Sequence, residues 1–88
     1  MHRGAMIMQY INAAVVALAE RVNFGISGVQ RACKVGYDHA NRIADEALKK
    51  GYFCHNYDYP EYQNLRVSDR GLELAAELRQ KAIATSED

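Results

Sequence analysis

The sequence has little of what marks several common protein classes. Its 11 basic and 11 acidic residues give a formal net charge of zero, whereas strongly non-specific nucleic-acid binders are basic. The two cysteines, Cys33 and Cys54, have neither a CxxC partner nor a closely spaced histidine pair, so we predict buried free thiols and no zinc site. No grouping of nucleophile, base and oxyanion donors is recognisable, so we expect neither enzyme activity nor a cofactor.

Long apolar runs are missing as well. The run over 13–19 is far shorter than the ~20 residues that span a bilayer, follows a single arginine and lacks a cleavage site. We therefore expect no membrane partner and a cytoplasmic, reducing setting. Without repeats or linkers, 88 residues predict one domain, with a flexible leader over 1–5, a folded body over 6–84 and a flexible tail over 85–88.

The charge that is present is unevenly distributed. Residues 20–50 carry six basic and four acidic side chains, whereas residues 51–88 carry four basic and seven acidic ones. The central stretch is mildly basic and the C-terminal part is acidic. This distribution permits DNA binding without requiring it.

Apolar residues at helical spacing predict a first helix over 6–21. Gly25 is suited to a left-handed position after that helix, and Ile26 is expected to be the remnant of a short strand. Ser27 is placed to cap a short second helix over 27–33, which would bury Val29.

The next residues predict a turn and a longer helix. Gly36 is free to take a positive φ angle, and Tyr37 is expected to anchor the corner by apolar packing. Asp38 is placed to cap a third helix over 38–50 and to favour the positive end of its dipole, and Gly51 ends it. The residues expected on the buried side of this helix are Ala40, Ile43, Ala44, Ala47 and Leu48.

The C-terminal third predicts a wing and a last helix. Candidate strands over 52–55 and 63–67 are separated by a loop with one proline and three tyrosines. Ser68 and its neighbours open a helix over 72–84. Its apolar side is expected to comprise Leu72, Ala75, Ala76, Leu78, Ala82 and Ile83. The predicted fold is therefore mainly α, a small α+β winged helix-turn-helix with a two-stranded wing and an extra C-terminal helix.

Two motifs carry a resemblance to known families. ISGVQR at 26–31, VGY at 35–37 and Ala40, Arg42 and Ile43 closely resemble the gamma domain of the FtsK/SpoIIIE DNA translocases. The resemblance spans about 22–53 and implies a winged helix whose third helix reads a short guanine-rich sequence in the major groove. These 88 residues have no room for an ATPase motor, so we expect a DNA-binding protein and not a translocase.

The sequence differs from that family at the start of the third helix. Asp38 and His39 stand where the family has Asn-Arg, and Asn41 stands where it has alanine. Arginine contacts two acceptors of guanine, which histidine cannot reproduce and aspartate opposes. We therefore expect a different DNA sequence to be recognised.

A second similarity lies at 65–71, which looks like the join between wing and final helix in winged-helix transcription regulators. In several of those families the final helix dimerises. This similarity suggests a homodimer through the first and last helices, which would bind two half-sites on DNA.

The candidate DNA contacts fall into two groups. Side chains on the third helix are expected to lie nearest the bases; these are His39, Asn41 and Arg42. Side chains on or just after the second helix are expected to hold phosphates; these are Ser27, Gln30, Arg31 and Lys34. For Arg42 the alternative is a surface ion pair with Asp38 or Asp45, and for the others it is simple solvation or capping.

The wing favours a second interpretation. Tyr57, Tyr59 and Tyr62 could contact a minor groove, pack against the core or form a protein interface, and the nearby Asp58 and Glu61 would repel phosphate. The alternative function is therefore a protein-binding winged helix, for instance a mobile-element factor that engages or mimics a host DNA-handling protein.

Overall fold

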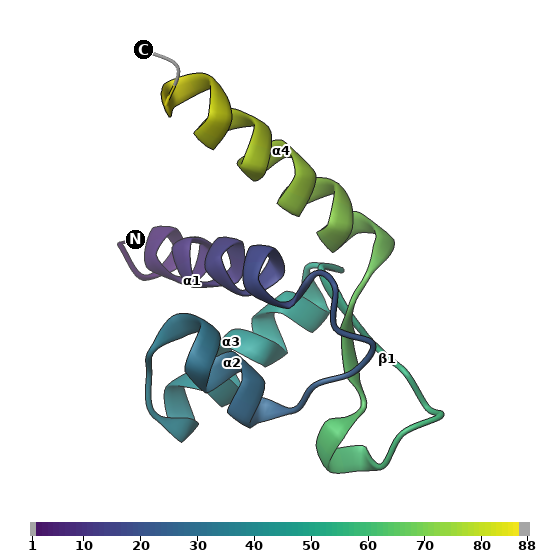
Figure 1. Cartoon of the computed structure of the whole chain (residues 1–88). Helices are drawn as coiled ribbons and strands as arrows, with labels where there is room; N and C mark the ends of the chain where they lie inside the picture. The colour runs from purple at the N-terminus through teal and green to yellow at the C-terminus, as the bar shows by residue number, and fades with distance from the viewer. Residues whose placement is uncertain (1, 87–88) are drawn as a thin grey trace.

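The computed structural model describes the backbone of residues 2–86 and the side chains of residues 7–82. Met1 of the predicted leader and residues 87–88 of the predicted tail lie outside the described residues. The elements, in chain order, are α1 (His2–Leu18), α2 (Ile26–Cys33), α3 (Tyr37–Lys49), β1 (Phe53–His55), the 3-10 helix η1 (Glu61–Gln63), β2 (Leu65–Val67) and α4 (Asp69–Ser86). This order confirms the predicted winged helix-turn-helix with an additional C-terminal helix (Figure 1).

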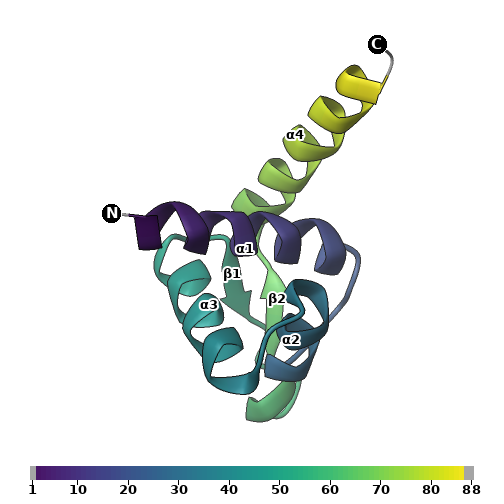
Figure 2. The same ribbon diagram turned by 90° about the vertical axis from the view of Figure 1, so that its left-hand side faces the viewer.

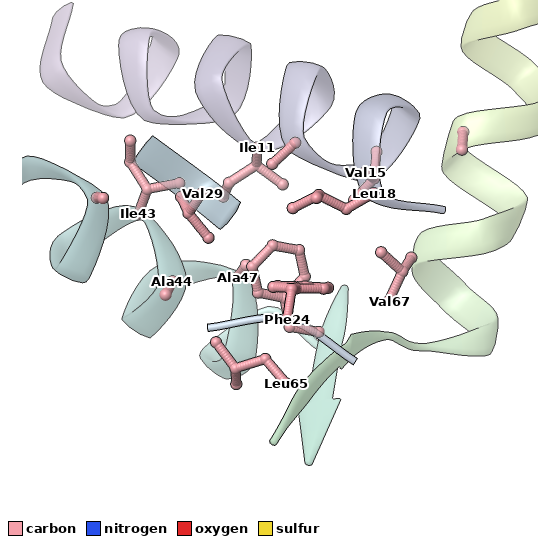
Figure 3. Packing of buried hydrophobic residues seen from close by; sticks show 14 residues of the cluster. Ile11, Val15, Leu18, Phe24, Val29, Ile43, Ala44, Ala47, Leu65 and Val67 are labelled. Atoms are coloured by element: carbon pink, nitrogen blue, oxygen red, sulfur yellow. The ribbon is translucent and has the colours of Figure 1, made fainter. Parts of the chain in front are cut away.

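The core lies where α1, α2 and α3 meet the two-stranded sheet. Ile11, Val15 and Leu18 point down from α1 towards the sheet, as Figure 3 shows. α3 buries the predicted alanines and Ile43, although Leu48 is only half-buried. The apolar spacing of α1 and α3 thus places one stripe of each helix in a shared core.

The wing is a short antiparallel hairpin in which Phe53 pairs with Val67 and His55 pairs with Leu65. Phe24 forms an isolated antiparallel bridge with Leu65 of β2. The Phe24 amide donates to the Leu65 carbonyl at 2.8 Å, and the Leu65 amide donates to the Phe24 carbonyl at 3.0 Å. The predicted strand remnant at Ile26 is therefore wrong, since the pairing residue is Phe24 and Ile26 already begins α2. Phe24 takes this place because its ring packs edge-to-face on Phe53, with centroids 5.0 Å apart.

Two predicted helix caps are also wrong. α2 begins one residue before Ser27, and its N-cap is Gly25, which makes no side-chain hydrogen bond. α3 likewise begins before Asp38, with Gly36 as its N-cap. Asp38 still lies in the first turn of α3, where a carboxylate favours the helix dipole.

The cap of α4 lies where the sequence indicated. The Ser68 hydroxyl accepts a hydrogen bond from the Gly71 amide at 3.1 Å and donates one to the Gly51 carbonyl. Its own carbonyl accepts the Leu72 amide at 2.8 Å. Ser68 therefore fixes the start of α4 and ties it to the end of α3.

The turn between α2 and α3 has a different backbone from the one predicted. Lys34 has the positive φ, 58°, whereas Gly36 has φ −75°. Tyr37 is 58% exposed and does not anchor the corner. Gly25 is extended, with φ −124°, so its predicted left-handed conformation is wrong. Gly51, predicted to end the third helix, follows α3 with φ 84°.

α4 packs its first half on α1 and then leaves the body (Figure 2). The Arg79 guanidinium donates to the Val16 carbonyl at 3.2 Å. Of the predicted apolar residues, Ala75 is buried and Leu78 packs half-buried against the core, whereas Leu72, Ala76 and Ala82 are exposed. Leu74, which was not predicted, packs against the core beside Leu78. Ile83 lies outside the described side chains. Within residues 2–86 no helix is long and apolar enough to cross a membrane.

Both cysteines are free thiols and are half-buried, not fully buried as predicted. The Cys33 thiol donates to the Tyr10 carbonyl at 3.3 Å. Burial raises the pKa of the Cys33 thiol, because desolvation disfavours the thiolate.

Candidate nucleic-acid interface

The outer face of α3 is polar, because the apolar residues of this helix lie on its opposite side and are buried in the core. Asp38, Asn41, Arg42, Asp45 and Lys49 are all exposed. Among the side chains of residues 7–82 no ion pair involves Arg42, so the pairing with Asp38 or Asp45 does not occur there. The Arg42 guanidinium is therefore available to an outside ligand.

Unlike Arg42, the lysines at the end of α3 have a carboxylate partner. Lys49 and Lys50 lie 3.8 and 3.9 Å from the carboxylate of Glu46, at the end of the helix where cations favour the dipole. His39 is half-buried, with its ring edge-to-face against Tyr10 and centroids 4.7 Å apart. His39 thus lies on the α1 side of α3, apart from Asn41.

A small hollow of about 120 Å³, here called the α2 hollow, opens at the N-terminus of α2. It is lined by Arg21, Asn23, Phe24, Gly25, Ser27, Gly28, Arg31 and Gln63. Helix N-termini present amide groups without intrahelical acceptors, and here two guanidinium groups stand beside them with no carboxylate among the lining residues. This set of donors suits a phosphate group.

The structure therefore brings together only part of the predicted phosphate-binding set. Ser27 and Arg31 line the α2 hollow, whereas Gln30 and Lys34 do not. Three lining residues with polar side chains were missed, namely Arg21, Asn23 and Gln63. Nothing local in the sequence marks them, because the Asn23 side-chain amide reaches the Gln63 carbonyl, at 3.0 Å, across 40 residues of chain.

The wing tyrosines do not form one cluster. Tyr57 and Tyr62 are 80% and 76% exposed, so the alternative of core packing is wrong for both. Tyr57 stacks on His55, with ring centroids 5.4 Å apart, whereas Tyr62 lines a separate groove against α3. Tyr59 lines neither the groove nor the α2 hollow.

That groove, here called the wing groove, has a volume of about 530 Å³ and lies between α3, the start of α2 and the wing. Asn41, a predicted base contact, lines it together with Asp45 and Glu61. In the part of the chain that the structure describes, no three His, Cys, Asp or Glu residues are grouped to hold a metal ion. No family model matches the chain, and no match is found among curated proteins or solved structures.

Proposed function

We propose that this chain is a small cytoplasmic protein that binds a specific double-stranded DNA sequence and acts as a transcriptional or DNA-handling regulator. The observation that carries the proposal is the pairing of an exposed Arg42, without an ion pair among residues 7–82, with the phosphate-sized α2 hollow between Arg21 and Arg31. The resemblance of 22–53 to the FtsK/SpoIIIE gamma domain supports the same function.

In this function α3 enters the major groove. Arg42 and Asn41 reach base edges, where arginine pairs with guanine and asparagine with adenine. The α2 hollow holds a backbone phosphate and fixes the register of the helix. The reaction is binding alone, and no covalent bond forms or breaks.

A homodimer through α1 and α4 is compatible with this arrangement. Figures 1 and 2 both show α4 leaving the body at the end opposite to the wing tip. The long dimension of the molecule, 44 Å against 29 and 21 Å, reflects this projection. A second copy on α4 would therefore leave α3 open to DNA, and paired copies would read two half-sites.

Selection of bound duplexes from a random pool tests the proposal. We expect one enriched motif, affinity that falls steeply with salt, and loss of about 1–3 kcal/mol of discrimination at one position in Arg42→Ala. Arg70→Ala is the matched control, because it removes an equal charge from α4, where Arg70 lies over the Tyr52 ring. An unenriched pool, or equal loss in both variants, would contradict sequence-specific binding through α3.

The second candidate function is protein binding through the wing side of α3. It is favoured by one observation, the presence of Asp45 and Glu61 in the wing groove with no lysine or arginine among the residues that line it. Such a surface repels phosphate and attracts cationic side chains. The two functions use adjoining surfaces that share Asn41. They can be tested separately through Arg42 and Arg31 for DNA and through Asp45 and Glu61 for a protein partner.

A further inference from the structure

The wing groove has an apolar floor and an acidic, aromatic rim. Ala44 and Leu65 are buried and Leu48 is half-buried, and all three line the groove. The rim carries Asp45 and Glu61, both exposed carboxylates. The groove therefore combines an apolar contact area with two carboxylates, and neither lysine nor arginine is among its lining residues.

Two tyrosines complete the rim. Tyr37 is 58% exposed and Tyr62 is 76% exposed, although both line the groove. Large aromatic side chains left open at a concave surface are typical of protein contact sites. A guanidinium group matches this setting better than an ammonium group, because it stacks on aromatic faces and pairs with carboxylates through a planar fork of N–H donors.

The size of the groove indicates how much of a partner it holds. A volume of about 530 Å³ falls within the range of roughly 300–1,000 Å³ typical of ligand pockets. A single side chain fills only part of that space. An arginine with apolar neighbours on either side would place its guanidinium at the rim and its neighbours on the floor.

We propose that the wing groove binds an arginine-bearing segment of a partner protein, with the guanidinium held by the acidic rim of Asp45 and Glu61 beside Tyr37 and Tyr62. This deepens the second candidate function and rests on it, but it does not depend on DNA binding. Because Asn41 also lines the groove, the bound segment covers one predicted base contact.

Selection of random nine-residue peptides displayed on phage, with the full chain as bait, tests this inference. The counter-selection bait is Asp45→Asn/Glu61→Gln, which keeps the shape of the rim and removes its charge. The matched control is Glu73→Gln/Glu77→Gln, which removes the same charge from exposed positions of α4. Equal urea midpoints for the three proteins show that both variants are folded.

We expect enriched peptides with an arginine flanked by apolar residues, bound by the native and control chains. Calorimetry should show at least tenfold weaker binding to the Asp45→Asn/Glu61→Gln variant, and at least tenfold weaker binding of the same peptide with citrulline in place of arginine. Amide resonances of Asp45, Glu61 and Leu65 should shift on titration, and those of α4 should not.

Three results would overturn the inference. These are a selection without enrichment, enriched peptides that lack a basic residue, and equal affinity for the native chain and the Asp45→Asn/Glu61→Gln variant. If no peptide is enriched and that variant instead loses DNA affinity, the groove belongs to the DNA-binding face. DNA binding that fails while the peptide result holds would contradict only the first candidate function.

Discussion

The α2 hollow and the wing groove share Gly25 as a lining residue and differ in every property that selects a ligand. The α2 hollow is small, polar and bordered by Arg21 and Arg31. The wing groove is about four times larger, apolar at its floor and bordered by Asp45 and Glu61. A net charge of zero therefore conceals two surfaces of opposite sign, one suited to an anion and the other to a cation.

The largest effect is expected where the two hollows meet. A Cβ at Gly25 would run into the Tyr62 carbonyl, and backbone cannot move aside as a flexible side chain can. We expect Gly25→Ala to lower the free energy of unfolding by about 2–3 kcal/mol, measured by urea denaturation. It should also weaken ligand binding at both hollows.

Gly36→Ala provides the control for this prediction. Gly36 is likewise an N-cap, but a Cβ there meets nothing within 4 Å. Its free energy of unfolding should stay within about 1 kcal/mol of the native value. Equal destabilisation in both variants would show that the loss reflects the cap and not the contact with the wing.

The next effect distinguishes the basic hollow from the rest of the surface. Arg21→Ala and Arg31→Ala should each weaken DNA binding by roughly ten- to a hundredfold, because each removes a charged hydrogen-bond donor worth roughly 1.5–3 kcal/mol. Each should also reduce the slope of log affinity against log salt by about 0.9, measured by fluorescence anisotropy. An unchanged slope would mean that no phosphate occupies the α2 hollow.

A smaller effect of opposite sign is expected from the acidic groove. Asp45→Asn/Glu61→Gln should raise DNA affinity by about threefold, because exposed charge interactions contribute up to about 1 kcal/mol. Glu73→Gln/Glu77→Gln on α4 should change it less. If Asp45→Asn/Glu61→Gln instead weakened DNA binding, the wing groove would take part in DNA binding and would not differ in this respect from the α2 hollow.

The smallest effect concerns the rim of the α2 hollow. Asn23→Ala removes the hydrogen bond to the Gln63 carbonyl and should lower the free energy of unfolding by about 0.5–1 kcal/mol, measured by urea denaturation. Asn41→Ala, an exposed substitution inside α3, should not lower the free energy of unfolding, because alanine is the better helix former. An equal loss in both variants would contradict a specific role for the bond between Asn23 and Gln63.

The sequence predicted the fold well where apolar spacing decided it. Ala40, Ile43, Ala44 and Ala47 recur on one face of α3, and all four are buried. Ser27 and Asp38 are favourable cap residues locally, but α2 and α3 begin before them, with Gly25 and Gly36 as N-caps. For α2, the pairing of Phe24 with Leu65 fixes the segment directly before the helix. Tertiary contacts there outweigh local preference.

The candidate site was only partly predictable for the same physical reason. Arg31 and Arg42 follow from their places on the two helices of the predicted helix-turn-helix. Gln63 joins Arg31 because the wing folds back on the start of α2, and Arg21 joins them from the segment between α1 and α2. No periodicity within these segments encodes the contact. The acidic composition of the wing was visible, but its meeting with Asp45 of α3 was not.

The reciprocal backbone pair of Phe24 and Leu65 has a consequence for hydrogen exchange. Each residue donates its amide to the carbonyl of the other, so neither amide is released to solvent unless the segment before α2 and the wing separate together. Both amides should therefore exchange in a single opening event with one free energy. We therefore expect the wing to open together with the segment that precedes α2, and not as a separate hairpin.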